Sequence, residues 1–369
     1  MISNCRLDDF AVVEITNELP FNRLGGVGSA IDSLISGFQT IGLPILWYLI
    51  DHHYQPFEID QLLREYANVA VGSLEELEAI RAPIAHLHTY NHNPGILQAL
   101  RGRRTVFTVH SLLRCEAESN GIDLGWAVQR QEQLIAACDA IVLVSNAELG
   151  HYRRLGYVAL NPRVSVIHNG IRRRPSPLPR PASRTLGFCG RLVPRKRPEY
   201  VQWILREEGF EAYSSLIAGR GFSAYARDLM ADQELGRRVR FLGWCGHERL
   251  EAFYARIDLL AIPSAYEPFG MVALEAVARG IPVVCAPIDG LVEILGRDAV
   301  YAEDDSYDSF REAMQRWLRM EQSALDAMAQ RAHRRFCERF TDVTVAANYR
   351  ALFDLRGTLP RTEHRGGQS

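Results

Sequence analysis

Short apolar runs alternate with longer amphipathic stretches along most of the chain. In the longer stretches, such as residues 30–41 and 126–137, apolar residues recur every three or four positions, which predicts helices with one buried face. Apolar strands separated by helices are typical of doubly wound parallel sheets, so the pattern predicts an α/β fold. The short runs predict strands at residues 12–15, 45–47, 84–87, 105–109, 140–144, 164–167, 185–189, 215–218, 239–242, 259–262, 283–285 and 299–301.

A proline-rich segment divides these strands into two series. Residues 172–184 hold four prolines in thirteen positions (RRRPSPLPRPASR), and such a stretch is unsuited to the interior of a sheet. A chain of 369 residues is long enough for two domains. We therefore expect two Rossmann-like domains facing a cleft, at 1–170 and 185–340, joined by a semi-stiff linker at 171–184. The polar, glycine-rich tail at 357–369 is predicted to be disordered.

The composition fits a soluble globular protein. Apolar residues make up 47% of the chain and charged residues 23%, and 42 basic side chains nearly balance 44 acidic ones, which argues against a nucleic-acid partner. The first 170 residues carry 12 arginines against 18 acidic residues, which argues against docking on anionic lipid. No apolar run approaches the roughly 18 residues of a transmembrane segment.

Localisation is predicted to be cytoplasmic. The first nine residues are too polar for a secretion signal. The seven cysteines are scattered along the chain and form neither a disulfide framework nor a metal-binding pair. Most lie in apolar runs, such as the one around Cys285, and we expect them to be reduced and buried.

A single lysine stands among 41 arginines. Lys196 is the only residue of its type in the sequence. A lysine ammonium is a compact point charge that fits a tight phosphate site, whereas an arginine guanidinium is a wide planar fork. The alternative is a leftover lysine on the surface, and its neighbours in the sequence weigh against that.

These neighbours form the segment GFCGRLVPRKRP at residues 187–198, which ends one strand and begins the following turn. Arg191 and Lys196 both lie in this turn. Two cations at the carboxyl end of one strand suit a diphosphate, which arginine grips with two hydrogen bonds and lysine holds as a point charge. A basic turn facing solvent is the alternative.

The segment PSAYEPFGMVALEAVARGIPVV at residues 263–284 predicts a loop and a helix after a strand. Ligands of parallel sheets bind at the carboxyl ends of strands, where the next helix begins. The backbone amides of Phe269, Gly270 and Met271 are therefore expected to receive a phosphate, and Gly270 leaves the approach open.

Two glutamates belong to the same segment. Glu275 lies about one and a half turns into the predicted helix, where a carboxylate suits the paired hydroxyls of a ribose. Glu267, in the loop, is expected to reach hydroxyls of a sugar carried by the phosphate. The alternative is one capping and one solvated glutamate.

Together these motifs resemble the retaining glycosyltransferases of family 4, the group 1 glycosyl transferases, which have the two-domain GT-B fold. Arg191 and Lys196 flank four residues, and Glu267 and Glu275 flank seven, as in that family. The resemblance is dense between about residues 185 and 293. It also includes IHNGI at 167–171, IAGRG at 217–221, RFLG at 240–243, LEAFYARIDLLAIP at 250–263 and APIDGLVE at 286–293.

The resemblance implies a hexosyltransferase that needs no metal or other cofactor. Its donor would be a nucleotide-diphosphate sugar, most commonly of UDP, and its acceptor a hydroxyl of a soluble small molecule or saccharide. Retention would follow from front-face displacement, in which the leaving phosphate accepts the acceptor's proton. A helix at 341–356 would cross back to the first domain. The implied catalytic residues are Glu267, His110, Arg191 and Lys196, and the implied donor-binding residues are Gly26, Gly28, Arg191, Lys196, Gly221, Phe269, Gly270, Met271 and Glu275.

Three positions depart from the family pattern. Arg195 and Arg220 stand where the family often has acidic residues, which concerns the phosphate surroundings and the contacts to the base. Ser111 stands where many relatives have aspartate.

In the first half, the resemblance is carried by two short segments. LGGVG at 24–28 is a glycine-rich turn before a predicted helix, where backbone amides attract anions, and the family likeness implies that Gly26 and Gly28 line the cleft. FTVHS at 107–111 places His110 at the carboxyl end of a strand, and similar enzymes have a histidine there that touches the donor sugar. A core or surface histidine is the alternative.

The segment HLHTYNHN at 86–93 suggests a metal site, since His86 and His88 share one face of a strand. We expect no carboxylate or cysteine nearby to complete such a site. We therefore expect residues of an acceptor pocket or loop, with Tyr90 and Asn91 as the candidate acceptor contacts.

Three other functions remain open. A nucleotide-sugar 2-epimerase of GT-B build would need acid and base groups around the sugar and no second substrate. A non-catalytic nucleotide-sugar-binding protein would be expected to lose part of the set Arg191, Lys196, Glu267 and Glu275. A nicotinamide dehydrogenase would need a full dinucleotide fingerprint, which the glycines at 25–28 do not form.

Overall fold

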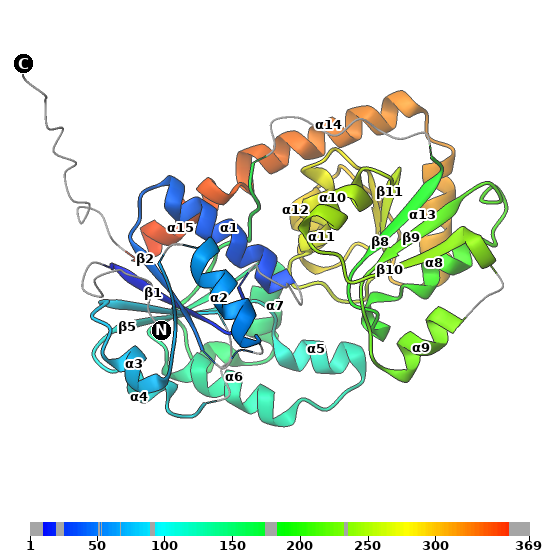
Figure 1. Ribbon diagram of the computed structural model, residues 1–369. Helices are drawn as coiled ribbons and strands as arrows, with labels where there is room; N and C mark the ends of the chain where they lie inside the picture. The colour runs from blue at the N-terminus through cyan, green and yellow to red at the C-terminus, as the bar shows by residue number, and fades with distance from the viewer. Residues whose placement is uncertain are drawn as a thin grey trace, which may run out of the picture.

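The computed structural model describes residues 10–19, 26–50, 52, 54–66, 68–88, 93–173, 183–231 and 235–353. They form two α/β domains, each built around a parallel sheet (Figure 1). Residues 174–182 of the predicted linker and the predicted tail lie outside the described residues.

The sheet of the first domain has seven strands in the order β3-β2-β1-β4-β5-β6-β7. The chain order reverses beside β1, and α/β sheets bind their ligands outside the carboxyl ends of strands at such a point. The strands are β1 Val12–Thr16, β2 Ile45–Leu49, β3 Val69–Val71, β4 Ile84–Leu87, β5 Arg104–Val109, β6 Ala140–Leu143 and β7 Val164–Val166.

The sheet of the second domain has six strands in the order β10-β9-β8-β11-β12-β13. Its chain order reverses beside β8, in the same way as the first sheet reverses beside β1. The strands are β8 Thr185–Cys189, β9 Ser214–Ala218, β10 Val239–Gly243, β11 Leu259–Ile262, β12 Val283–Cys285 and β13 Val300–Tyr301.

Helices connect the strands and cover both faces of each sheet (Figure 1). Those of the first domain are α1 Gly26–Thr40, α2 Pro56–Glu65, α3 Leu74–Glu78, α4 Ile96–Ala99, α5 Leu113–Asn120, α6 Gly125–Ala137 and α7 Asn146–Arg154. The helices that follow β8 are α8 Glu199–Ile204, α9 Ala224–Ala231, α10 His247–Tyr254, α11 Met271–Val277, α12 Asp289–Leu295, α13 Tyr307–Leu318, α14 Gln322–Arg339 and α15 Asp342–Phe353.

The fold predicted from the apolar pattern is confirmed. Each predicted strand is present with its ends within two residues of the prediction, and the predicted helices at 30–41 and 126–137 are α1 and α6. Among the strands of the described residues, β3 alone was not predicted. Helix α1 begins at Gly26, four residues before the predicted start at residue 30, so Gly26 and Gly28 lie in the helix and not in a turn ahead of it.

The last helix returns to the first domain. Helix α14 belongs to the second domain, and α15 then packs along α1, as Figure 1 shows at the domain's outer side. Ser36 on α1 donates a hydrogen bond of 2.6 Å to the Asp342 carboxylate on α15. A Cβ atom at Gly37 would lie 2.3 Å from the carbonyl oxygen of Asp342, so a glycine is required for this close packing.

Replacing Gly37 with alanine should therefore destabilise the protein by about 2 kcal/mol, because the added methyl group forces α1 and α15 apart. Gly150 on α7 is the matched control, since no atom lies within 4 Å of a Cβ built there. Gly150→Ala should leave the free energy of unfolding unchanged or raise it slightly, as alanine is the better helix former. Equal denaturant midpoints for the two variants would contradict the packing described.

The described cysteines are free, and their burial corrects one expectation. Cys115, Cys138 and Cys285 are buried, but the other three described cysteines are only partly buried. The expectation that most cysteines are buried is therefore wrong for the described residues. Among the described residues, no helix has the length and apolar character needed to cross a membrane.

Candidate active site

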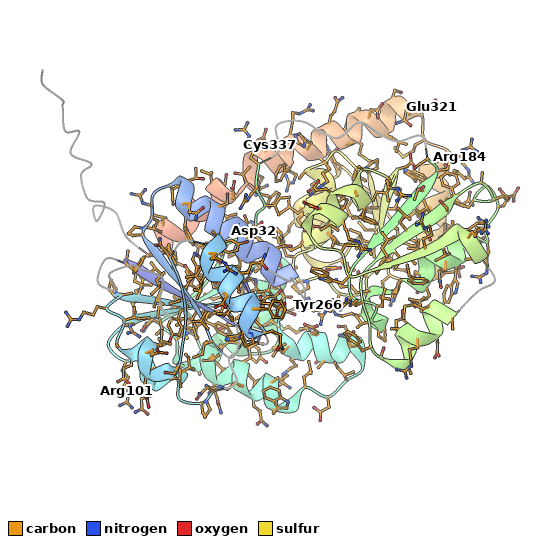
Figure 2. All side chains as sticks on the ribbon, in the orientation of Figure 1. Asp32, Arg101, Arg184, Tyr266, Glu321 and Cys337 are labelled. Atoms are coloured by element: carbon orange, nitrogen blue, oxygen red, sulfur yellow. The ribbon has the colours of Figure 1, made fainter. Side chains whose placement is uncertain are left out.

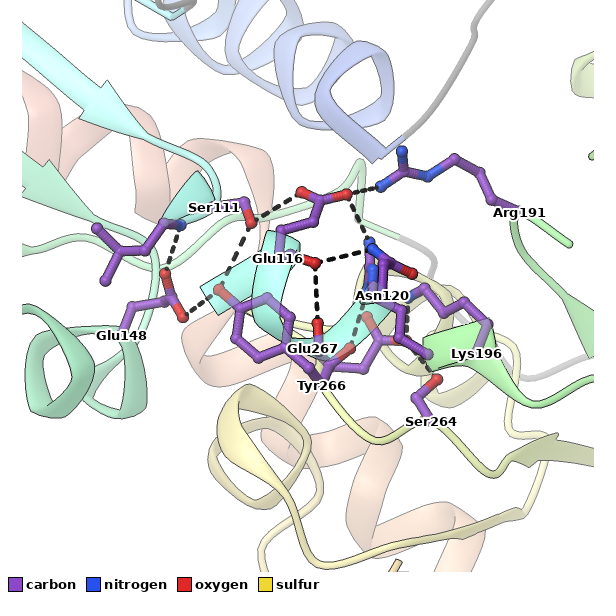
Figure 3. A network of polar contacts seen from close by, with 12 residues as sticks. Ser111, Glu116, Asn120, Glu148, Arg191, Lys196, Ser264, Tyr266 and Glu267 are labelled. Carbon is purple, nitrogen blue, oxygen red and sulfur yellow. Dashed lines mark hydrogen bonds and ion pairs between the residues drawn. The ribbon is translucent and has the colours of Figure 1, made fainter. Parts of the chain in front are cut away.

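The two domains meet where the carboxyl ends of their central strands face one another. Figure 3 shows the side chains at this junction, joined by hydrogen bonds and ion pairs. Ser111 lies in the loop after β5, and Glu116 lies on α5, the helix that follows this loop. From the second domain, a turn after β8 supplies Arg191, Arg195 and Lys196. The loop after β11 supplies Ser264, Tyr266 and Glu267, and Figure 2 places Tyr266 at the junction.

Lys196 and Glu267 form an ion pair inside the second domain. The Lys196 ammonium donates to the Glu267 carboxylate, which also accepts a hydrogen bond of 2.9 Å from the Ser264 hydroxyl. Only 13% of the lysine side chain and 6% of the glutamate side chain are exposed. The lone lysine is therefore a nearly buried cation, and the alternative of a leftover surface lysine is wrong.

Burial sets the protonation of this pair. Burial lowers the pKa of Lys196 to about 8, although the Glu267 carboxylate beside it acts in the opposite direction. Burial would raise the pKa of Glu267, but the positive charges of Lys196 and Arg195 outweigh it and hold the pKa below its ordinary value. At neutral pH the pair is ionised, and its ammonium is close to its titration range.

Arg191 and Arg195 reach across the junction to the first domain. Both guanidinium groups contact the same carboxylate oxygen of Glu116, Arg195 at 3.2 Å. Arg195 is buried and also donates to the carbonyl oxygen of Tyr266 at 2.9 Å. The other Glu116 oxygen accepts from the Ser111 hydroxyl at 3.1 Å. Burial would raise the pKa of Glu116, but the two arginines lower it to about 2, so this carboxylate is a permanent anion facing two cations.

A second set of contacts holds the domains together beside this network. The Tyr266 hydroxyl donates to buried Glu148 on α7 at 2.8 Å, and Ser145 donates to the carbonyl oxygen of Pro268 at 2.6 Å. Glu293 on α12 accepts from the backbone amides of Asn146 and Ala147 at 3.0 and 2.8 Å. A carboxylate of the second domain thus lies at the positive end of a helix of the first.

Glu275 lies within α11 and is buried. Its carboxylate accepts a hydrogen bond of 2.7 Å from the Tyr254 hydroxyl on α10. Its carbonyl oxygen accepts from Arg279, whose guanidinium lies 4.5 Å from the centre of the Tyr254 ring. Glu275 is therefore held rigidly, and a solvated glutamate, the alternative for this position, is excluded.

The start of α11 meets the glycine-rich turn of the first domain. Gly270 precedes α11 with a φ of 102°, and a Cβ there would lie 2.5 Å from Leu291, so only glycine fits without strain. A Cβ at Gly26 would lie 3.4 Å from the Met271 side chain, which places the two predicted donor-binding segments side by side. Phe269 and Met271 are buried, as is Gly28 on α1.

Gly221 lies in the loop after β9, against the turn that carries the cations. A Cβ there would lie 2.4 Å from the carbonyl oxygen of Leu192. Two residues earlier, a Cβ at Gly219 would lie 1.8 Å from the carbonyl oxygen of Gly190. Glycines thus allow two loops at the carboxyl ends of β8 and β9 to touch through their backbones.

His110 follows β5 at the junction and contacts a buried polar cluster. Its Nε2 lies 3.1 Å from Nδ1 of His88, whose Nε2 lies 2.6 Å from a carboxylate oxygen of Glu14 on β1. His86 Nδ1 lies 2.7 Å from the same oxygen. The expectation that no carboxylate lies near these histidines is therefore wrong, because parallel pairing puts Glu14 opposite His86.

These distances describe a hydrogen-bonded cluster. Ring nitrogens and a carboxylate oxygen of Glu14, His86 and His88 lie within 4.8 Å of one another, a group of three not found elsewhere among the described residues. Two ligands of one zinc ion each lie about 2 Å from the metal, so the ion would have to lie between them. Here the Glu14 carboxylate oxygen itself occupies the position between the rings of His86 and His88 and contacts both directly.

The structure thus brings most of the sequence-predicted site residues to the junction. Tyr90 and Asn91, the candidate acceptor contacts, lie outside the described residues, as does His92. The roles assigned to them stay predictions.

Sequence reasoning missed Glu116, Glu148 and Tyr254 as members of the site. Nothing in the sequence marks the first two, since a glutamate on an amphipathic helix is usually solvated. Glu14 did carry a signal, because a carboxylate inside the apolar run AVVEIT needs a buried partner. Arg195 was visible only as a departure from the family pattern.

Family models match both domains. The model described as "Glycosyltransferase Family 4" matches residues 44–174, and that described as "Glycosyl transferases group 1" matches residues 172–335. An uncharacterized glycosyltransferase of Methanocaldococcus jannaschii is 40% identical over 111 residues, 29% of this chain and 28% of that protein. A D-inositol 3-phosphate glycosyltransferase of Mycolicibacterium smegmatis is 29% identical over 255 residues, 64% of this chain and 58% of that protein. The matched region thus spans less than two thirds of either relative.

The fold is similar to that of solved glycosyltransferase structures. HepE of Anabaena, solved with UDP and glucose, has a TM-score of 0.73 and 17% identity, and the match covers 94% of this chain and 99% of that chain. At this identity the likeness shows the fold alone, and that fold is GT-B. With one family model on each domain and this fold, the chain belongs to the group 1 glycosyl transferases of glycosyltransferase family 4.

Proposed function

We propose that the protein transfers a sugar from a nucleotide-diphosphate donor to a hydroxyl of a soluble small molecule or saccharide. The observation that carries this proposal is the nearly buried Lys196 ammonium, held by Glu267 in a turn that also carries Arg191 and Arg195. Three cations at one junction are suited to a ligand with several negative charges. A diphosphate is such a ligand.

The cations act on the leaving group. When the bond between the anomeric carbon and the diphosphate breaks, negative charge develops on the phosphate oxygens, and cations already in place stabilise it. Lys196 supplies a point charge and Arg191 a bidentate fork. Glu275, held by Tyr254, is assigned to the ribose hydroxyls, and Glu267 to hydroxyls of the donor sugar.

We infer a retaining hexosyl transfer by front-face displacement. The acceptor oxygen forms its bond to the anomeric carbon on the face from which the diphosphate leaves, and the departing phosphate oxygen takes the acceptor's proton. Because protein cations provide the charge, we propose that no metal is required, so chelation with EDTA should leave turnover unchanged. A trapped glycosyl–enzyme adduct in the wild-type protein would contradict the single displacement.

The comparisons support a sugar nucleotide as donor. HepE of Anabaena was solved with UDP and glucose, and this chain shares its fold. We therefore propose UDP as the first base to test. The acceptor named for the M. smegmatis relative, D-inositol 3-phosphate, is one candidate within the small-molecule class.

The experiment is a panel of UDP-, GDP-, ADP- and dTDP-sugars, each incubated with the protein with and without candidate acceptors. Nucleotide release that requires an acceptor is the predicted result. Conversion of one sugar nucleotide into another without acceptor would instead identify an epimerase. Tight binding with no turnover in the presence of any acceptor would favour a binding protein.

In the unliganded protein Glu116 pairs with Arg191 and Arg195, so a donor that binds these arginines must compete with its carboxylate. Replacing Glu116 with glutamine removes its negative charge, so UDP should bind at least about tenfold more tightly, since a hydrogen bond to a charged group contributes about 1.5 kcal/mol or more. Glu118 on the same helix is exposed, and Glu118→Gln is the matched control. Titration calorimetry with UDP measures both, and weaker binding by Glu116→Gln would show that the carboxylate supports the site.

A further inference from the structure

Two buried histidines of the first domain, His86 and His88, and the partly buried His110 form a cluster that ends at the proposed active site. Glu14 on β1 and His86 on β4 are paired in register, and His88 and His110 lie on the same side of the sheet. Trp47 on β2 stacks on His88, with ring centres 6.1 Å apart. The chain of contacts runs from Glu14 through His88 to His110, and Ser111, the next residue, contacts Glu116.

The hydrogen positions along this chain follow from its first member. The buried Glu14 carboxylate is ionised, because the adjoining His86 and His88 outweigh the effect of burial and lower its pKa to about 2. An ionised carboxylate only accepts hydrogen bonds, so Nε2 of His88, 2.6 Å away, must carry a hydrogen.

The other ring nitrogen of His88, Nδ1, contacts His110. Burial lowers the pKa of His88 to about 4, so at neutral pH its ring carries one hydrogen, which is on Nε2. Nδ1 therefore has a lone pair and must accept from Nε2 of His110, 3.1 Å away. Burial, with the neighbouring histidines, also holds the pKa of His110 well below its ordinary value, so His110 is neutral and its own Nδ1 has a free lone pair.

We propose that Glu14 and His88 are positioning residues that fix His110 in the tautomer with hydrogen on Nε2. Nδ1 of His110 then accepts a hydrogen bond from a hydroxyl of the donor sugar. The use of His110 by the sugar rests on the proposed function, but its tautomer is a property of the free protein.

The remaining neighbours form a separate branch. His86 Nε2 lies 2.7 Å from the Thr108 hydroxyl, which lies 2.9 Å from the hydroxyl of Tyr349 on α15. His86 meets His110 only through Glu14 and His88. A change at Thr108 therefore disturbs the buried cluster without touching the path to His110, and Thr108→Val is the matched control.

The test uses the full-length protein labelled with ¹⁵N-histidine, without donor, at pH 7.5. Long-range ¹H–¹⁵N correlation spectra distinguish the two neutral tautomers and the cation, and His110 is assigned by loss of its signals in His110→Gln. We expect the Nε2–H tautomer in the wild type and in Thr108→Val. We expect a mixture of tautomers in Glu14→Gln and in His88→Phe. A protonated ring, the Nδ1–H tautomer in the wild type, or an unchanged tautomer in His88→Phe would overturn the proposal.

Activity provides the second readout. The value of kcat/KM for the donor should fall about five- to tenfold in His88→Phe, the loss of roughly one hydrogen bond. Combining His88→Phe with His110→Gln should lower it no further than His110→Gln alone, whereas additive losses would show that His88 does not act through His110. If His88→Phe fails to fold, the wild-type and Glu14→Gln spectra still decide. The predicted tautomer in a protein without transferase activity would count against the proposed function alone.

Discussion

Replacing Lys196 with alanine should lower kcat by about 10²- to 10³-fold, the usual effect of removing one preorganised group that stabilises developing negative charge. The Lys196 side chain is 13% exposed and bound to Glu267, so water cannot replace the ammonium at the same position. The negative charge on the leaving diphosphate increases as the glycosidic bond breaks. The fold decrease in kcat should therefore exceed the fold change in KM. Steady-state kinetics with the donor identified in the panel measure both constants.

Arg197→Ala is the control for this variant. Arg197 is the next residue along the chain, but its guanidinium pairs with Asp305 and not with Glu267. It also lies over the Tyr200 ring. Its removal should change kcat less than about threefold. If Lys196→Ala retains full turnover, or if both variants lose the same activity, the phosphate assignment is wrong.

The pH profile provides a separate test of the same residue. Because the pKa of Lys196 in the free protein is about 8, its positive charge is present below that pH and lost above it. The value of kcat/KM reports groups in the free enzyme, so it should fall as pH rises through about 8. A bound diphosphate favours the charged ammonium, so kcat at saturating donor should persist to higher pH. A flat kcat/KM between pH 7 and 9 would contradict this.

The second large effect is expected for Glu267→Gln, which should lower kcat/KM by roughly 10²-fold. The amide keeps the shape of the side chain but removes the charge that holds Lys196. Burial already lowers the lysine pKa, and Glu267 is the main group that raises it. In the variant the pKa of Lys196 should therefore fall below about 8, and the alkaline limb of kcat/KM should move to lower pH.

This shift separates the electrostatic role of Glu267 from a general loss of structure. Glu207→Gln is the control, because Glu207 is a partly buried carboxylate that accepts a hydrogen bond of 2.7 Å from Tyr307 and is not among the groups that shift the pKa of Lys196. It should leave the alkaline limb in place. A Glu267→Gln protein that loses activity with its pH limb unmoved would show that the carboxylate does not control the lysine.

Much of the fold was predictable because buried parallel strands leave a strong apolar pattern. The strands β8, β11 and β12 were predicted with the ends found in the structure, whereas β3 was missed. In the second domain the site residues are close in sequence to the strand ends that position them. Lys196 was the clearest case, since a single lysine among arginines lies next to a strand end.

The contacts between segments far apart in the sequence were not predictable. Glu116 meets Arg191 from 75 positions away, and nothing in either segment indicates the other. Glu14 meets His88 across 74 positions, and only sheet order brings them together. Sequence patterns report which residues are buried and which lie at strand ends. They do not report which strand is the neighbour of which.

We propose that a sugar moves from a nucleotide diphosphate to an acceptor hydroxyl at the Lys196 site. The most direct measurement follows the reaction of donor, acceptor and wild-type protein by ¹H NMR, with Lys196→Ala in parallel. We expect one new glycoside signal for each nucleotide diphosphate released, with the anomeric configuration of the donor. With Lys196→Ala this signal should be nearly absent. Loss of donor without a glycoside, an inverted anomeric signal, or equal rates for the two proteins would contradict it.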